Sequence, residues 1–176
     1  MNEDLRYPVG RHQDEGPLGE PRRLELIEQI AEAPERLRAA VHGLNSEQLD
    51  TPYRHGGWTV RQVIHHVPDS HLNAYIRFKL ALTEDSPAIK LYAEELWAAL
   101  PDTGRTAPEV SLALLDALHK RWVILLRAMD AAGWARTLQH PEKGRLTLDQ
   151  MLAIYAWHGR HHVAHITSLR EREGWG

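Results

Sequence analysis

Histidines are concentrated near the end of this chain, where His158, His161, His162 and His165 fall within eight residues. Imidazole is a common metal ligand, and two histidines four residues apart on a helix project from the same face, one turn apart. The apolar residues of this segment place His162 inside their stripe and His158 at its edge. The second pair, His161 and His165, falls further round the helix. Because a metal between packed helices needs inward ligands, His158 and His162 are predicted to bind one ion.

A third ligand is expected from an earlier segment, which carries His65, His66 and His71. Helical spacing places His66 on the edge of the apolar face, whereas His65 points nearly the opposite way, as a surface residue or as support for a ligand. His71 falls close to the apolar side, more than a turn further along. His66 is therefore the predicted third ligand. Three histidines leave one coordination position for water, which is the pattern of catalytic zinc sites.

The composition limits the chemistry of this site. The 176 residues include no cysteine, which excludes thiolate ligands, disulfides and a cysteine nucleophile. One divalent ion per chain is predicted, with zinc as the first choice and nickel as the second, since imidazole binds both. Such an ion would lower the pKa of a bound water to about 7.

Two charged residues after His66 are candidates for catalysis. Asp69, one turn further along the helix, could orient an imidazole or accept a proton from water, and a solvated carboxylate is an equal alternative. Arg77 projects near the His66 side and could bind an anionic group of a small-molecule substrate, with an ordinary surface cation as the alternative.

The spacing of apolar residues predicts four long helices, near 21–43, 59–83, 107–132 and 147–172. Two of them begin with capping boxes, Thr59 with Gln62 and Thr147 with Gln150. Strands are expected in less than about a tenth of the chain, at most as a small hairpin before the last helix. The pattern therefore predicts an all-α protein, in which residues 21–176 form a single four-helix bundle and residues 1–20 an irregular N-terminal arm.

Charge and hydropathy argue against several classes of partner. The formal net charge is −3 and no basic block is present, so neither nucleic acid nor a membrane surface is expected as a partner. No apolar run approaches membrane-spanning length, and the first residues lack the apolar core of a signal peptide. A cytoplasmic location is therefore expected.

Two stretches carry a family resemblance: LDTPYRHGGWTVRQVIHHVPDSHLNAYIRFKLALTEDSPAIK at 49–90 and YAWHGRHHVAHITSL at 155–169. They resemble the YfiT-type metal-dependent hydrolases of the DinB superfamily, and the similarity spans nearly the whole chain. The resemblance implies a four-helix bundle of DinB/YfiT type, usually a homodimer, with one divalent metal held by three histidines.

The resemblance also implies the same ligands as the helical faces do. The family's first ligand precedes an L-A-D sequence, matched here by His66 before Val67-Pro68-Asp69, and the other two are matched by His158 and His162. Pro68 departs from the family pattern. A proline inside a helix removes a backbone hydrogen bond, so a kink beside the metal site is expected.

The first functional interpretation is a metal-dependent hydrolase that activates water. Relatives in the superfamily suggest a second one, a low-molecular-weight thiol S-transferase of the bacillithiol or mycothiol type. A third is a metal-stabilised dimer module without catalytic activity.

Overall fold

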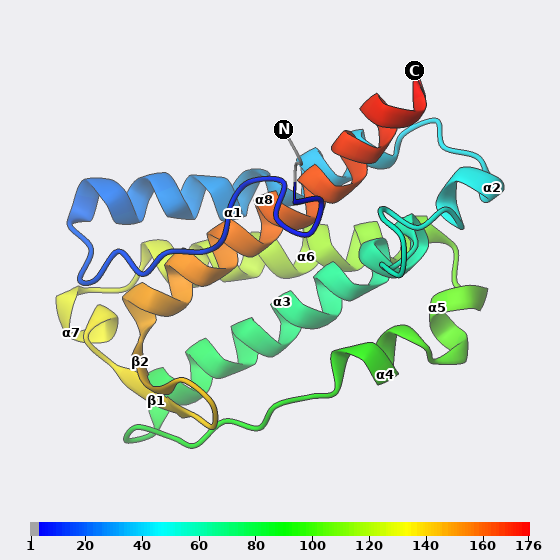
Figure 1. Ribbon diagram of the computed structural model, residues 1–176. Coiled ribbons are helices and arrows are strands. Elements are labelled where there is room, and N and C mark those ends of the chain that lie inside the picture. Colours follow the sequence, from blue (N-terminus) through cyan, green and yellow to red (C-terminus); the bar gives the residue numbers. More distant parts are fainter. Residues whose placement is uncertain (1–3) are drawn as a thin grey trace.

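The computed structural model describes residues 4–176 (Figure 1). Its four long helices are α1 (Glu20–Val41), α3 (Val60–Thr83), α6 (Pro108–Arg127) and α8 (Leu148–Glu173). The short helices are α2 (Ser46–Leu49), α4 (Glu94–Ala98), α5 (Pro101–Arg105) and α7 (Ala131–Trp134). The strands β1 (Thr137–His140) and β2 (Gly144–Thr147) form an antiparallel hairpin. The predicted all-α, four-helix architecture and its small hairpin are confirmed.

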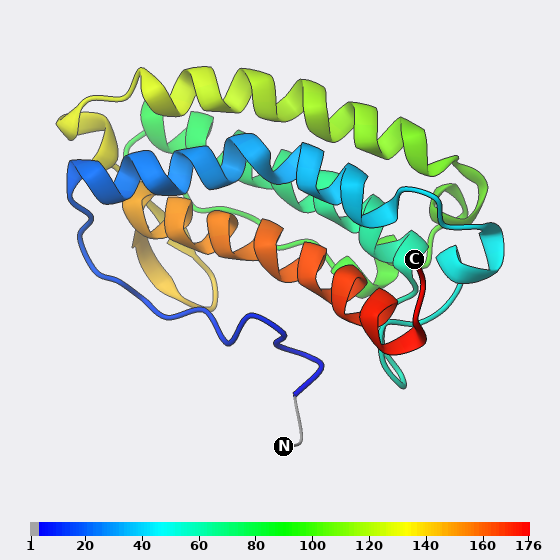
Figure 2. The ribbon, with the colours of Figure 1, turned by 90° about the horizontal axis from the view of Figure 1, so that it is seen from above.

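Each long helix packs against two others, so that the four form a closed ring in the order α1, α6, α3, α8. Figures 1 and 2 show that α1 and α8 run in one direction and that α3 and α6 run in the other. The neighbours α3 and α6 are thus parallel, and the chain must return along the bundle between them. Residues 84–107 form this crossover, which contains α4 and α5 and lies against α3.

Side-chain caps explain where two of the long helices begin. Thr59 Oγ1 accepts a hydrogen bond from the Gln62 amide at 3.1 Å, and Gln62 Oε1 accepts one from the Thr59 amide at 3.0 Å. Thr147 and Gln150 form the same capping box before α8. Such reciprocal caps satisfy amides that lack a partner within the helix.

The end of α6 differs from the prediction. The helix ends at Arg127 rather than near residue 132, because Asp130 begins the separate helix α7. The Asp130 carboxylate accepts a hydrogen bond from the Gly133 amide at 2.8 Å and so caps this new turn.

Two prolines lie inside long helices without ending them. Pro34 lies within α1 and Pro68 within α3, which continues as one helix from Val60 to Thr83. The kink expected at Pro68 therefore does not interrupt α3. Each proline lacks an N–H group, so the carbonyl four residues earlier loses its helical donor. For Pro34 this carbonyl belongs to Ile30.

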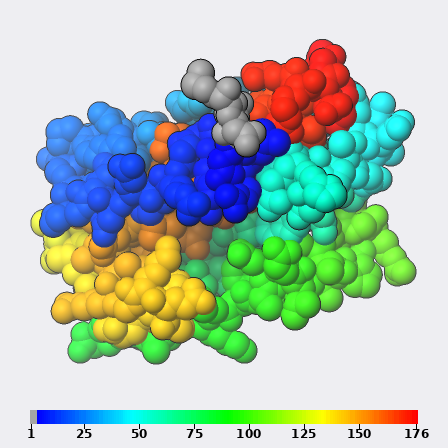
Figure 3. Space-filling model, viewed as in Figure 1, coloured from blue at the N-terminus to red at the C-terminus, as the bar shows by residue number. Residues whose placement is uncertain are grey.

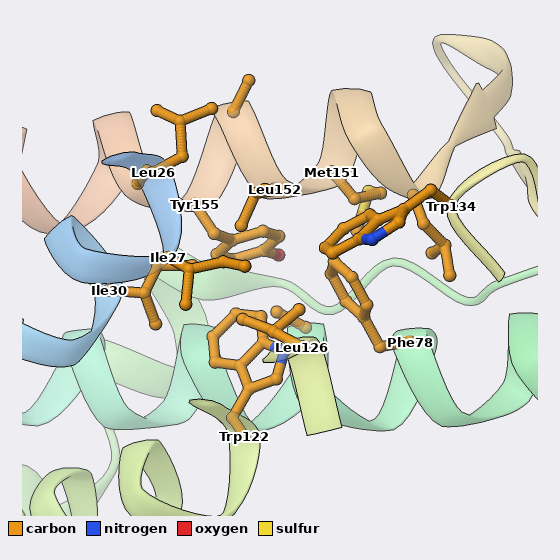
Figure 4. Close-up of a cluster of buried hydrophobic side chains, with 14 of the residues drawn as sticks. Leu26, Ile27, Ile30, Phe78, Trp122, Leu126, Trp134, Met151, Leu152 and Tyr155 are labelled. Atoms are coloured by element: carbon orange, nitrogen blue, oxygen red, sulfur yellow. The ribbon is translucent and has the colours of Figure 1, made fainter. Parts of the chain in front are cut away.

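The apolar core forms two clusters along the bundle axis. One surrounds Trp122 and Phe78 near the hairpin end, where side chains from all four long helices meet (Figure 4). The other surrounds Ile64 and Leu115 near the opposite end. Polar side chains of α3 and α8 lie between them, and they form the site described below.

Residues 4–19 cross the surface of α8 as an extended arm (Figure 1). The indole Nε1 of Trp157 donates to the Gly10 carbonyl at 3.0 Å, and Gln150 Nε2 donates to Asp14 at 2.8 Å. The arm thereby covers one face of α8. Among the helices of residues 4–176, none is long and apolar enough to cross a membrane.

Candidate metal centre

Three histidines from two helices meet in the middle of the bundle. His66 of α3 and His158 and His162 of α8 each offer a ring nitrogen, and these nitrogens all lie within 4.8 Å of one another. The Nε2 atoms of His66 and His158 are 3.2 Å apart. Two nitrogens bound at 2.0–2.1 Å to one tetrahedral zinc ion would be about 3.3 Å apart, so these residues fit such an ion. The structure thus brings together the three histidines that the sequence predicted as ligands.

Burial keeps these imidazoles in the neutral form that metal binding requires. It lowers the pKa of His66 to about 4. It also holds the pKa values of His158 and His162 well below the usual range, and the neighbouring imidazoles lower them further. The buried Nδ1 atom of His162 has no hydrogen-bond partner in residues 4–176.

A line of two further histidines extends from His158 into the bundle. The Nδ1 atom of His158 is 3.0 Å from Nε2 of His71, and the Nδ1 atom of His71 is 2.8 Å from Nε2 of His119. His119, on α6, donates from Nδ1 to the carbonyl of Ile30 at 2.6 Å. The exposed fractions of His71 and His119 are only 0% and 1%. Neither contact was predicted, because helical spacing within one segment does not reveal which side chains meet across helices.

The second histidine pair of α8, His161 and His165, lies outside this group but is buried. The ring of His161 stacks on Trp157 at 4.4 Å, and that of His165 stacks on Tyr53 at 3.9 Å. His165 Nε2 also donates to the carbonyl of Arg6 at 3.2 Å. The arm and the loop before α3 therefore cover this pair.

His65 points away from the three histidines, as its helical position predicted. The surface location offered for it is wrong, because His65 is buried against α6 with Nδ1 at 2.7 Å from Ser111 Oγ. His65 was alternatively expected to support a metal ligand. Among the described residues, its side chain makes no hydrogen bond to His158 or His162.

Two cavities meet at His158 and Glu94. The first, of about 300 Å³, lies between α3, α8, the hairpin and the crossover, and Ser70, Arg77 and Tyr155 line it. The second, of about 260 Å³, lies beneath the loop before α3 and is lined by Trp58, His66 and the four histidines of α8. Figure 3 shows the surface hollowed between the blue arm, the yellow hairpin and the green crossover. Small molecules can thus reach His158 from two sides.

The two predicted catalytic residues differ in their surroundings. Asp69 is half-buried and lines neither cavity, and burial, with the charge of Asp102, raises its pKa to about 6. Arg77 is only 8% exposed, so the surface-cation alternative is wrong. Its guanidinium donates to the Tyr155 hydroxyl and to the Lys90 carbonyl, both at 3.1 Å.

Comparison with known proteins gives the family. The sequence profile described as "DinB superfamily" matches residues 29–166. This chain belongs to the DinB superfamily. A Bacillus mycoides member named "Putative metal-dependent hydrolase" is 55% identical over 98% of this chain and 99% of its own length. A Bacillus cereus relative of the same name is 54% identical, with the same coverage.

Two solved structures confirm the fold. YfiT from Bacillus subtilis, described as a probable metal-dependent hydrolase with an unusual four-helix bundle topology, is 47% identical and superposes with a TM-score of 0.95. The match covers 98% of this chain and 99% of YfiT. A second four-helix bundle protein, TT2238, is 22% identical with a TM-score of 0.56 over 80% of this chain and 94% of its own, and it supports the fold alone.

Proposed function

We propose that this DinB-superfamily protein hydrolyses a small-molecule substrate with the help of one divalent ion held by His66, His158 and His162. One observation supports this proposal: three neutral imidazoles lie at metal-binding spacing and line two cavities. A divalent ion supplies Lewis acidity and lowers the pKa of a coordinated water. Zinc suits the three nitrogen donors best, and nickel is the alternative.

Two carboxylates are candidates to accept a proton from the attacking water. Glu94 lines both cavities where they meet at His158. Its side chain is exposed, and partial desolvation together with the charges of Glu95 and Glu142 raises its pKa. Asp69, the candidate from the sequence, has a raised pKa of about 6 but lines neither cavity. A general base must come within hydrogen-bond reach of the proton it accepts, so position favours Glu94 over Asp69.

Arg77 is proposed to bind an anionic group of the substrate. Its buried guanidinium faces a phenol and a carbonyl, and it forms no ion pair with a carboxylate within residues 4–176. A buried cation without a counter-ion is costly, and a ligand carboxylate or phosphate would relieve this cost. Because Arg77 and His158 line the same cavity, the anionic group and the reacting bond would share that cavity.

The test is a screen of the zinc-loaded and nickel-loaded protein against paired esters and amides, with and without a carboxylate. We expect hydrolysis that favours the anionic member of a pair, and a preference that Arg77→Gln removes. Lys143→Gln, at the exposed rim of the same cavity, is the matched control. Glu94→Gln should lower kcat by about 100-fold or more, whereas Asp69→Asn should change it little. A metal-loaded protein without hydrolytic activity on any pair would contradict the proposal.

The meeting of two cavities also favours a second candidate, the thiol S-transferase. Such a reaction needs a thiol and an electrophile at one metal, and the cavities approach His158 from different sides. Transfer of a low-molecular-weight thiol to an electrophile, without hydrolysis, would select this function. A protein that binds the ion but does neither would be the metal-stabilised module without activity.

We further propose that the protein forms a homodimer, as its resemblance to YfiT-type proteins suggests. Light scattering at micromolar concentration should give about twice the mass of the 20.1 kDa chain, and a mass of one chain would contradict the proposal.

A further inference from the structure

The line of histidines behind His158 begins at a backbone carbonyl that a proline sets free. In α1, residue 34 would normally donate its N–H to the carbonyl of Ile30, but Pro34 has no N–H. The Ile30 carbonyl instead accepts the hydrogen bond from Nδ1 of His119 at 2.6 Å. A carbonyl oxygen can only accept, so the position of one proton is fixed: Nδ1 of His119 carries it.

The remaining protons follow from this one, ring by ring. A neutral imidazole has one N–H, so Nε2 of His119 is an acceptor and the 2.8 Å contact requires a proton on Nδ1 of His71. Nε2 of His71 is then an acceptor, and the 3.0 Å contact requires a proton on Nδ1 of His158. Nε2 of His158 then carries no proton and keeps its lone pair, which faces Ser70 Oγ at 3.4 Å. The same Nε2 atom lies 3.2 Å from Nε2 of His66.

The opposite order of protons is excluded by the same contacts. A proton on Nε2 of His158 would leave Nδ1 without one, and the three contacts would then share only two donors. Restoring a third donor would require a cationic ring, yet His71 and His119 are buried and form no ion pair with a carboxylate in the described part of the chain. Burial of an unpaired charge is strongly unfavourable.

We propose that His71 and His119 are positioning residues that hold His158 in the Nδ1–H tautomer, with its Nε2 lone pair directed to the metal. The inference concerns residues that bind no metal themselves, and it rests on the proposed metal site. Outer hydrogen bonds of this kind fix the tautomer and the ring orientation of a histidine ligand, and they raise its basicity. Here the outer partners are imidazoles rather than the usual carboxylate or carbonyl, and the carbonyl stands only at the far end of the line.

The tautomers can be measured directly in the metal-free protein. We expect long-range ¹H–¹⁵N correlation spectra of histidine-labelled wild-type protein to show the Nδ1–H form for His119, His71 and His158. A dominant Nε2–H form of His158 would overturn the inference. This readout needs neither substrate nor activity, so a failure of the proposed hydrolase function would leave it unchanged.

Variants then test whether the line affects metal affinity. His119→Phe removes the link to Ile30 while keeping an aromatic ring, and we expect zinc affinity, measured by chelator competition, to fall about 10- to 100-fold. His65→Phe is the matched control, because His65 is also buried between α3 and α6 but contacts Ser111 instead. Its affinity should remain close to wild type. Equal affinities for a folded His119→Phe protein and the wild type would overturn the proposal. Should His119→Phe fail to fold, the wild-type spectra decide.

Discussion

The two histidine pairs of α8 have the same spacing but different surroundings. His158 and His162 face α3, where His66 completes a group of three ring nitrogens. His161 and His165 face the N-terminal arm and the loop before α3. The ring of His165 stacks on Tyr53 of the loop, and the ring of His161 stacks on Trp157 of α8 and lies 5.9 Å from that of Tyr7 in the arm. The first pair therefore lies against another histidine, whereas the second pair lies against tyrosine and tryptophan rings. Spacing on a helix therefore provides a possible pair of ligands, and the opposing element determines whether a metal can bind.

The largest effect is expected when a single histidine of the first pair is replaced, and the same replacement in the second pair provides the comparison. His162→Ala should lower zinc affinity by more than about 100-fold, since loss of a ligand must exceed the 10- to 100-fold effect of an outer partner. His165→Ala removes an equally buried ring and should retain most of the metal at the same chelator concentration. Metal content measured after dialysis compares the two. Loss of metal in His165→Ala and not in His162→Ala would show that the pairs have exchanged roles.

Acid should destabilise the metal-free protein through both pairs. Burial lowers the pKa of His66 to about 4, of His161 to about 3 and of His165 to about 4, below the usual value near 6.5. As pH falls below 6.5, the unfolded chain therefore binds protons that the folded chain does not. Each such histidine lowers the free energy of unfolding by about 1.4 kcal/mol per pH unit. Because the unfolded imidazole is only half protonated at pH 6.5, two of them would remove about 3 kcal/mol between pH 6.5 and 5.

Urea titrations of the metal-free protein at several pH values would measure this loss. A free energy of unfolding that stays constant from pH 7 to 5 would contradict the burial of these rings. Saturation with zinc should reduce the dependence of the unfolding free energy on pH, because protons must then compete with the ion at His158 and His162, the inner pair.

A smaller effect is expected from deleting residues 1–12, which include the arm's contacts with His165 and Trp157. The deletion should expose His161 and His165, the outer pair, and leave the inner pair within the bundle. Diethyl pyrocarbonate should then modify His161 and His165 faster than in the full chain, while His162 reacts as before. Unchanged rates at all three histidines would show that the arm does not protect the outer pair.

The smallest effect is expected from Tyr53→Leu, which removes the ring stacked on His165 at 3.9 Å. Stacked aromatic pairs contribute about 0.5–1.5 kcal/mol beyond their buried area, so stability should fall by a similar amount. Thermal unfolding would detect it, and zinc affinity should not change. A marked loss of zinc would mean that the outer pair supports the inner one.

The sequence was most informative where one helix carried the whole signal. Apolar spacing and the capping boxes at Thr59 and Thr147 located the long helices, and face arithmetic selected His66, His158 and His162. Contacts between different segments could not be predicted from residue spacing within one helix. His119 contacts His71 across two helices. Glu94 lines the same cavity as His158, and it lies on a crossover whose path depends on the parallel arrangement of α3 and α6. The early end of α6 depended on a local cap at Asp130, which competes with a pattern that otherwise favours continued helix.

The hydrogen bonds from Ile30 to His158 pass through one residue on each of the four long helices. Ion binding and the alignment of these histidines are thermodynamically linked. If the alignment strengthens ion binding, then ion binding must stabilise the alignment by the same free energy. An ion at 1,000 times its dissociation constant stabilises a folded protein by about 4.1 kcal/mol. Part of that gain would reach the contact between α1 and α6, neither of which supplies a ligand. Slower amide exchange near Ile30 on addition of zinc would then report the occupancy of the centre from a helix that supplies no ligand.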